Sequence, residues 1–167
     1  MRISILLLFF IILGHCTTAQ KKFGFEMGAD FPSGYTIGIF SKFSPASKLE
    51  FSYGTDLKFE DSKQVHTITL NHGYYFGNLN KKWEKKLWII NTGFVYGYSD
   101  SAQKKVSSLL LNVHFSREIP LSAKWSLEPK LGIAGVLMNK VENKDEFHEV
   151  NTIPVFPVLG AKVLFCL

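Results

Sequence analysis

Two residues of this sequence have the types and the spacing that hydrolytic chemistry needs. His114 and Ser116 stand two positions apart in the stretch His114-Phe115-Ser116. Side chains two apart on an extended strand point to the same face. A histidine beside a serine allows the imidazole to act as general base and the hydroxyl as nucleophile. His114 and Ser116 are therefore the catalytic candidates, and they depend on a strand to hold both side chains together.

Other kinds of site have weaker support. The chain contains no glycine-rich phosphate loop before a helix and no paired metal-ligand spacing. His66 and His72 are six residues apart, which on a strand separates them by about 20 Å, too far to share a metal. We therefore predict that the protein uses neither a cofactor nor a metal.

The N-terminus has the pattern of a secretory signal peptide. Arg2 supplies a positive charge, Ile5 to Leu13 is an unbroken apolar run, and Thr17-Thr18-Ala19 offers small residues before Gln20. This order is what a signal peptidase reads. We predict cleavage between Ala19 and Gln20, so that residues 1–19 are the signal and residues 20–167 form one domain.

The two cysteines bear on how the exported chain is held. Cleavage after Ala19 leaves Cys166 as the sole cysteine, which rules out an internal disulfide. An alternative is a lipoprotein anchored through Cys16, because Leu13-Gly14-His15-Cys16 loosely resembles a lipobox. His15 stands where that signal has glycine or alanine, which favours simple cleavage.

The rest of the chain alternates between apolar and polar residues with the period of a β-strand. From Leu49 to Phe59, apolar or aromatic residues mostly occupy one side and charged or small residues the other. We find no helical period after the signal. Eight stretches are predicted as strands: Lys22–Phe31, Tyr35–Phe43, Leu49–Phe59, Val65–Phe76, Leu87–Tyr98, Val106–Arg117, Trp125–Met138 and Thr152–Leu167.

Eight strands of about ten residues suit a sheet that crosses a bilayer and closes on itself. The apolar set is bulky and aromatic, and the opposite set is rich in glycine and serine, as a narrow barrel interior requires. The polar set also holds charges of both signs that could pair inside: Glu26, Asp30, Glu50, Asp56, Lys58, Glu128, Lys130 and Lys162. The predicted fold is all-β, a single antiparallel up-and-down transmembrane β-barrel of about eight strands. Alternation alone leaves open a secreted soluble barrel or sandwich with its apolar face inward.

Several stretches resemble the small porin-like outer-membrane β-barrel proteins of Bacteroidetes. They are the Ala19-Gln20 junction, Ile119 to Ser122 with Trp125 to Gly132, and the closing Gly160 to Phe165. The likeness implies a cell outer membrane location and a last strand that the barrel-assembly machinery recognises. That strand usually ends in an aromatic residue, whereas this chain ends in Leu167 with Phe165 two residues before it.

The candidate pair also resembles the His-x-Ser of outer-membrane lipid A deacylases. In those enzymes the two side chains face lipid near the outer leaflet, and an asparagine typically follows the serine. Here His114 and Ser116 fall on the presumed interior face and Arg117 follows, so a lipid A-modifying hydrolase is only the alternative function.

Charge distribution and the lack of a convincing catalytic set lead to the functional prediction. The net charge is +5, with +3 on the connector Gly77 to Lys86 and −2 on the four connectors placed outside the cell. Nucleic acid is an implausible partner for an exported barrel. We predict a non-enzymatic monomer in contact with outer-membrane lipid, with a structural role or a surface-binding role for an unknown extracellular ligand. A small passive channel is a further alternative, although eight strands enclose little more than their own side chains.

Overall fold

The described part of the chain forms one sheet of ten antiparallel strands. The computed structural model describes residues 22–56, 65–80, 82, 86–100, 104–143, 147–149 and 154–167, and this part of the chain contains no helix. The strands are β1 (Lys22–Phe31), β2 (Gly34–Ser44), β3 (Ser47–Thr55), β4 (Val65–Phe76), β5 (Trp88–Asp100), β6 (Lys104–Arg117), β7 (Ile119–Pro120), β8 (Trp125–Asn143), β9 (Phe147–Glu149) and β10 (Val155–Cys166).

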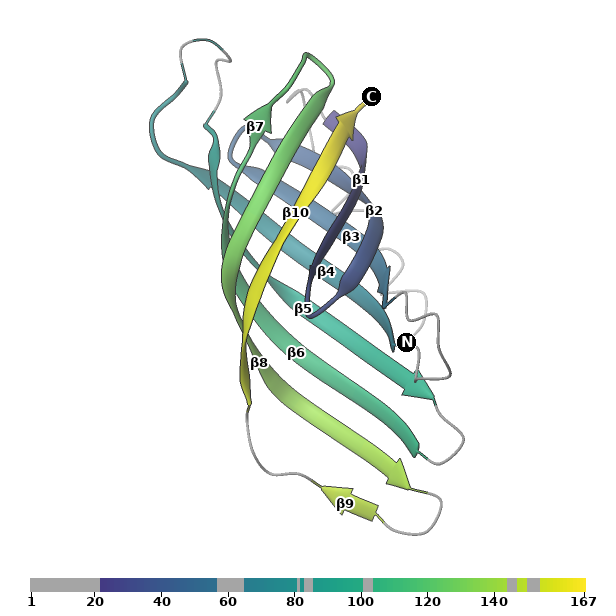
Figure 1. Cartoon of the computed structure of the whole chain (residues 1–167). Helices are drawn as coiled ribbons and strands as arrows, with labels where there is room; N and C mark the ends of the chain where they lie inside the picture. Colours follow the sequence, from purple (N-terminus) through teal and green to yellow (C-terminus); the bar gives the residue numbers. More distant parts are fainter. Residues whose placement is uncertain are drawn as a thin grey trace, which may run out of the picture.

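Eight of these strands close into an up-and-down barrel (Figure 1). Each strand pairs with its neighbour in sequence, and β8 follows β6. The last strand closes the sheet because β10 pairs with β1, where Phe25 lies opposite Phe165, and with β8, where Leu131 lies opposite Leu159. The two short strands β7 and β9 both pair with β8. The prediction of a single eight-stranded antiparallel barrel is confirmed.

The two ends of the barrel differ, and we name them by what they carry. The turn end carries the Ser44–Ser47 turn, the β7 hairpin and the C-terminus. The loop end carries the Phe31–Gly34 turn and the strand ends at Thr55, Val65, Asp100, Lys104 and Asn143. In Figure 1 the turn end is at the top and the loop end at the bottom.

The strand predictions are confirmed, with differences at the ends. Lys22–Phe31 and Val65–Phe76 match β1 and β4 residue for residue. The largest difference is β8, which runs for 19 residues into the charged stretch predicted as a connector. It continues because β6 pairs with it as far as Asn143 and β9 pairs on its other side. The signal region, with Ala19 and Gln20, and residues 57–64 lie outside the described residues.

The apolar side chains point outward from the barrel all the way round. Met27 and Ile37 are 65% and 61% exposed. The other exposed large apolar residues include Phe25, Phe51, Leu70, Phe94, Leu111, Phe115, Leu131, Ile133 and Leu159, from seven of the eight barrel strands. The polar side chains of the same strands point inward and are buried. This is the reverse of a soluble barrel, whose apolar face is inside, and it shows which of the two strand faces points inward.

The strand β4 follows the same rule despite its two histidines. Thr67, Thr69 and Asn71 are buried, whereas His66 and His72 lie on the outer face. The His66 ring stacks on Tyr53, whose hydroxyl is 2.5 Å from the His66 Nδ1. The ring of His72 lies 6.0 Å from that of Phe43.

The aromatic residue Phe40 faces the interior, and its position depends on a glycine. Phe40 breaks the alternation of β2 and is 1% exposed. It pairs with Gly24 of β1, where an added Cβ would lie 2.5 Å from the Cζ atom of Phe40 and would also meet the carbonyl oxygen of Phe165. The ring therefore fills space that only glycine leaves open.

We expect Gly24→Ala to lower the free energy of unfolding by about 1–3 kcal/mol, the usual cost of overpacking. The matched control is Gly135→Ala in β8, where an added Cβ meets nothing within 4 Å. Urea titrations of the refolded protein in detergent micelles measure both. Equal unfolding midpoints for the two variants would contradict this account of Phe40.

Candidate functional site

The middle of the barrel interior holds a cluster of five buried charges. Lys48 Nζ lies 2.5 Å from Glu128 Oε2 and 2.6 Å from Glu50 Oε1. Lys162 Nζ lies 2.5 Å from Glu50 Oε1 and 3.1 Å from Glu26 Oε2. These residues come from β1, β3, β8 and β10, so the cluster joins strands across the barrel. Charges removed from water are tolerated because each has a close partner of opposite sign.

Two further ion pairs extend this arrangement. Toward the turn end, the Glu118 carboxylate lies 2.8 Å from Lys42 Nζ and accepts hydrogen bonds from the hydroxyls of Tyr75 and Ser126. Lys130 Nζ lies 2.6 Å from Asp30 Oδ2. Each of the nine charged side chains in the cluster and these two pairs therefore has an oppositely charged partner inside the barrel.

Sequence reasoning found part of this network. Glu26, Asp30, Glu50, Glu128, Lys130 and Lys162 face inward and pair, as predicted. Asp56 is half-buried, and Lys58 lies outside the described residues. The prediction missed Lys48, because its strand was started one residue later. It also missed Glu118, which directly follows the predicted end of its strand at Arg117. In both cases the period of two simply continues, Lys48 from Glu50 and Glu118 from Ser116.

The catalytic candidates lie on one face of β6, as predicted, and that face is the interior. His114 and Ser116 are 1% and 3% exposed. The Ser116 hydroxyl donates to Glu128 Oε1 at 2.7 Å and accepts from the Asn91 amide at 2.8 Å. Neither ring nitrogen of His114 has a hydrogen-bond partner among the described residues. The serine is thus held by the charged cluster rather than by the histidine.

This geometry gives the pair a different chemical setting from the one that hydrolysis needs. A nucleophilic serine has to reach a base and a substrate at the same time. Ser116 instead bridges an amide and a carboxylate inside the barrel, and His114 packs against Gly132 of β8, where an added Cβ would meet its side chain. No described contact links the histidine to the serine.

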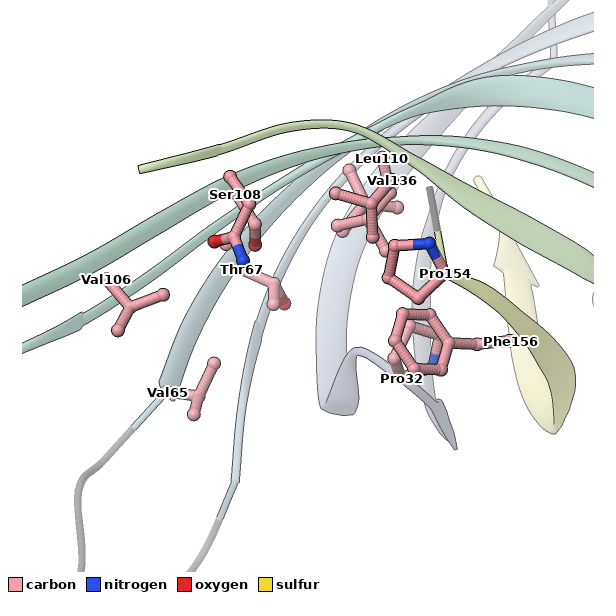
Figure 2. A pocket seen from close by; sticks show the side chains of 12 residues that line it. Pro32, Val65, Thr67, Val106, Ser108, Leu110, Val136, Pro154 and Phe156 are labelled. Atoms are coloured by element: carbon pink, nitrogen blue, oxygen red, sulfur yellow. The ribbon is translucent and has the colours of Figure 1, made fainter. Parts of the chain in front are cut away.

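A separate, mainly apolar cavity of about 280 Å³ lies inside the barrel at the loop end (Figure 2). Val95, Leu110 and Val136 of its wall belong to a buried apolar cluster with Ala134 and Val158, and Phe156 packs against that cluster. Pro32, Val65, Val106 and Pro154 line the rest of its apolar wall, and Thr67, Ser108 and Asn139 are its polar side chains. The pattern of the sequence did not predict this cavity, because its walls come from five strands and two connections.

The comparisons with known proteins assign no family to this chain. Comparison with protein-family models, with curated proteins and with solved structures finds no match. The likeness to small outer-membrane barrels thus stays a prediction from the residues.

The described residues contain neither a membrane-spanning helix nor a cluster of metal-binding side chains. The described residues contain no helix that is long and apolar enough to cross a membrane. No group of three or more His, Cys, Asp or Glu side chains among them is arranged to hold a metal ion. Cys166 is a free thiol near the end of β10.

Proposed function

We propose that this protein is an integral outer-membrane β-barrel. The observation that carries the proposal is the outward apolar surface around a closed, charged interior. Apolar surface of this extent is costly in water but favourable against lipid tails. Closure matters equally, because a spanning sheet has to satisfy all of its backbone groups internally. Strands of 9 to 19 residues are long enough for a tilted crossing.

The proposed role is non-enzymatic and is performed at the loop end. The interior charges pair with one another and Ser116 is engaged with Glu128, so these side chains support the structure. The charged side chains inside the barrel speak against a channel, since small barrels are packed with their own side chains. What remains is the loop end, with its connections and its cavity, which suits surface binding.

The expected partners follow from the location. They are the lipids around the apolar surface and the barrel-assembly machinery during insertion, with the protein acting as a monomer. We also propose membership of the porin-like outer-membrane barrels of Bacteroidetes, on the resemblance of the signal junction and the strands from Trp125 onward. The signal cleaved between Ala19 and Gln20 would deliver the chain for export.

Fractionation combined with gel migration tests the proposal. We expect the native protein in the outer-membrane fraction, with an unboiled band that migrates differently from the boiled one, because a closed barrel resists detergent until heated. The control is the same sample denatured in urea before loading, which should run as the boiled band. A soluble periplasmic protein whose migration does not change on boiling would overturn the proposal.

A further inference from the structure

The cavity at the loop end has the features of a binding site rather than of a packing gap. It measures about 280 Å³, close to the lower end of the size range of small-molecule sites. An apolar cavity of about 150 Å³ can already take up benzene. None of the described side chains that line it is charged. Figure 2 shows Leu110 and Val136 at one side of the cavity and Val65 and Val106 at the other.

One polar group of the wall lacks the protein partner that burial demands. Asn139 Oδ1 is buried and has no hydrogen-bond partner among the described residues. Ser108 lies directly opposite Asn139 across the β6–β8 pair, and both line the cavity. The third polar side chain, Thr67, already donates to the Ser33 carbonyl oxygen at 3.2 Å. A buried acceptor without a donor costs free energy unless something supplies one.

We propose that this cavity binds a small, neutral, mostly apolar molecule that carries one hydrogen-bond donor. The apolar walls take the body of the ligand, and Asn139 Oδ1, with Ser108 beside it, receives the donor. The ligand is neutral because the described part of the wall carries no charged side chain, and an ion would lose its hydration there without gaining a partner. The volume admits a body of about two fused rings and not a whole lipid. This inference rests on the proposed surface-binding role and names the chemistry of the ligand.

The experiment uses the refolded full-length mature chain in lipid nanodiscs, with indole and N-methylindole as probes. The two probes differ in the N–H donor, and both match the apolar body. Methyl NMR of valine, leucine and isoleucine reports the position of binding. We expect indole to shift the methyl signals of Val95, Leu110 and Val136 saturably. We expect N-methylindole to bind about three- to tenfold more weakly, as the loss of one hydrogen bond implies.

Variants separate the cavity from the lipid and from the fold. Asn139→Leu should abolish the preference for indole, and Val106→Trp at the half-buried rim should abolish binding. The matched control is Val155→Trp, which is 62% exposed on the outer face and should leave binding unchanged. If either cavity variant fails to fold, the comparison of the two probes on the native chain still decides.

Two results would overturn the inference. One is equal shifts at outward methyl groups such as Ile37 and Leu70, which means partition into lipid only. The other is no shift at the cavity in a barrel that is heat-modifiable and fully folded. Neither result touches the outer-membrane proposal, which is decided by fractionation of the native protein.

Discussion

Replacing Phe94 by arginine should destabilise the barrel in a bilayer by about 2–4 kcal/mol, the cost of a cationic side chain on the lipid face at the membrane midplane. Phe94 is the central residue of the 13-residue strand β5 and is 48% exposed on the outer face. If that face met water, the same substitution would change stability by about 0.5 kcal/mol or less. Reversible unfolding in urea, with the protein in lipid vesicles, measures the difference.

The matched control for Phe94→Arg is Tyr98→Arg. Tyr98 lies on the same strand and the same face, two residues before the end of β5 at Asp100, and is 36% exposed. Near the interface the penalty falls to about 0–1 kcal/mol. A cost that depends on depth identifies lipid around the barrel. Small and equal costs at the two positions would show that the apolar face is not embedded.

The second large effect is expected from Glu128→Leu, which should lower the free energy of unfolding by about 3–5 kcal/mol. Glu128 is 0% exposed and contacts Lys48 at 2.5 Å and Ser116 at 2.7 Å. Its removal leaves a buried lysine with Glu50 as its one remaining close carboxylate and leaves the serine hydroxyl without its acceptor. The loss of this close partner from buried Lys48, together with the orphaned Ser116 hydroxyl, is the reason for the size of the effect.

A control and a second variant test that reason. Lys105→Met removes the ion pair of Lys105 with Asp100, where the two groups are 3.8 Å apart and both side chains are about half exposed. It should change stability by about 1 kcal/mol or less. The double variant Lys48→Met with Glu128→Leu should regain part of the lost free energy of unfolding, because it also removes the buried lysine that has lost its partner. No recovery would mean that lost packing, and not charge, causes the effect.

The course of the strands could be predicted from the sequence because strand alternation is local. From Leu49 to Thr55, alternate side chains of β3 point to opposite faces of the sheet. The same holds for β1 and β4, whose bounds match the prediction. Closure was predicted because a sheet that spans a bilayer cannot leave open edges, and it is confirmed by the pairing of β10 with β1. The strand face shared by His114 and Ser116 was predictable for the same reason.

Some features of the site needed more than local pattern. The long β8 exceeds its prediction because pairing with β6 and β9 supports a charged sequence that by itself indicates a connector. Lys48 and Glu118 lie at strand margins, where the pattern is weakest, and their roles appear only when Glu128 and Lys42 meet them.

The sequence by itself determined an all-β chain of eight main strands, each with one apolar and one polar face, because these properties depend on neighbours along the chain. Only the tertiary structure decided which face points inward, since both arrangements satisfy the same period of two. It also decided that Lys162 pairs with Glu26 and Glu50 and that Asn139 is left without a donor beside an apolar cavity. Those contacts join residues from opposite ends of the chain, and closure of the barrel is what brings them together.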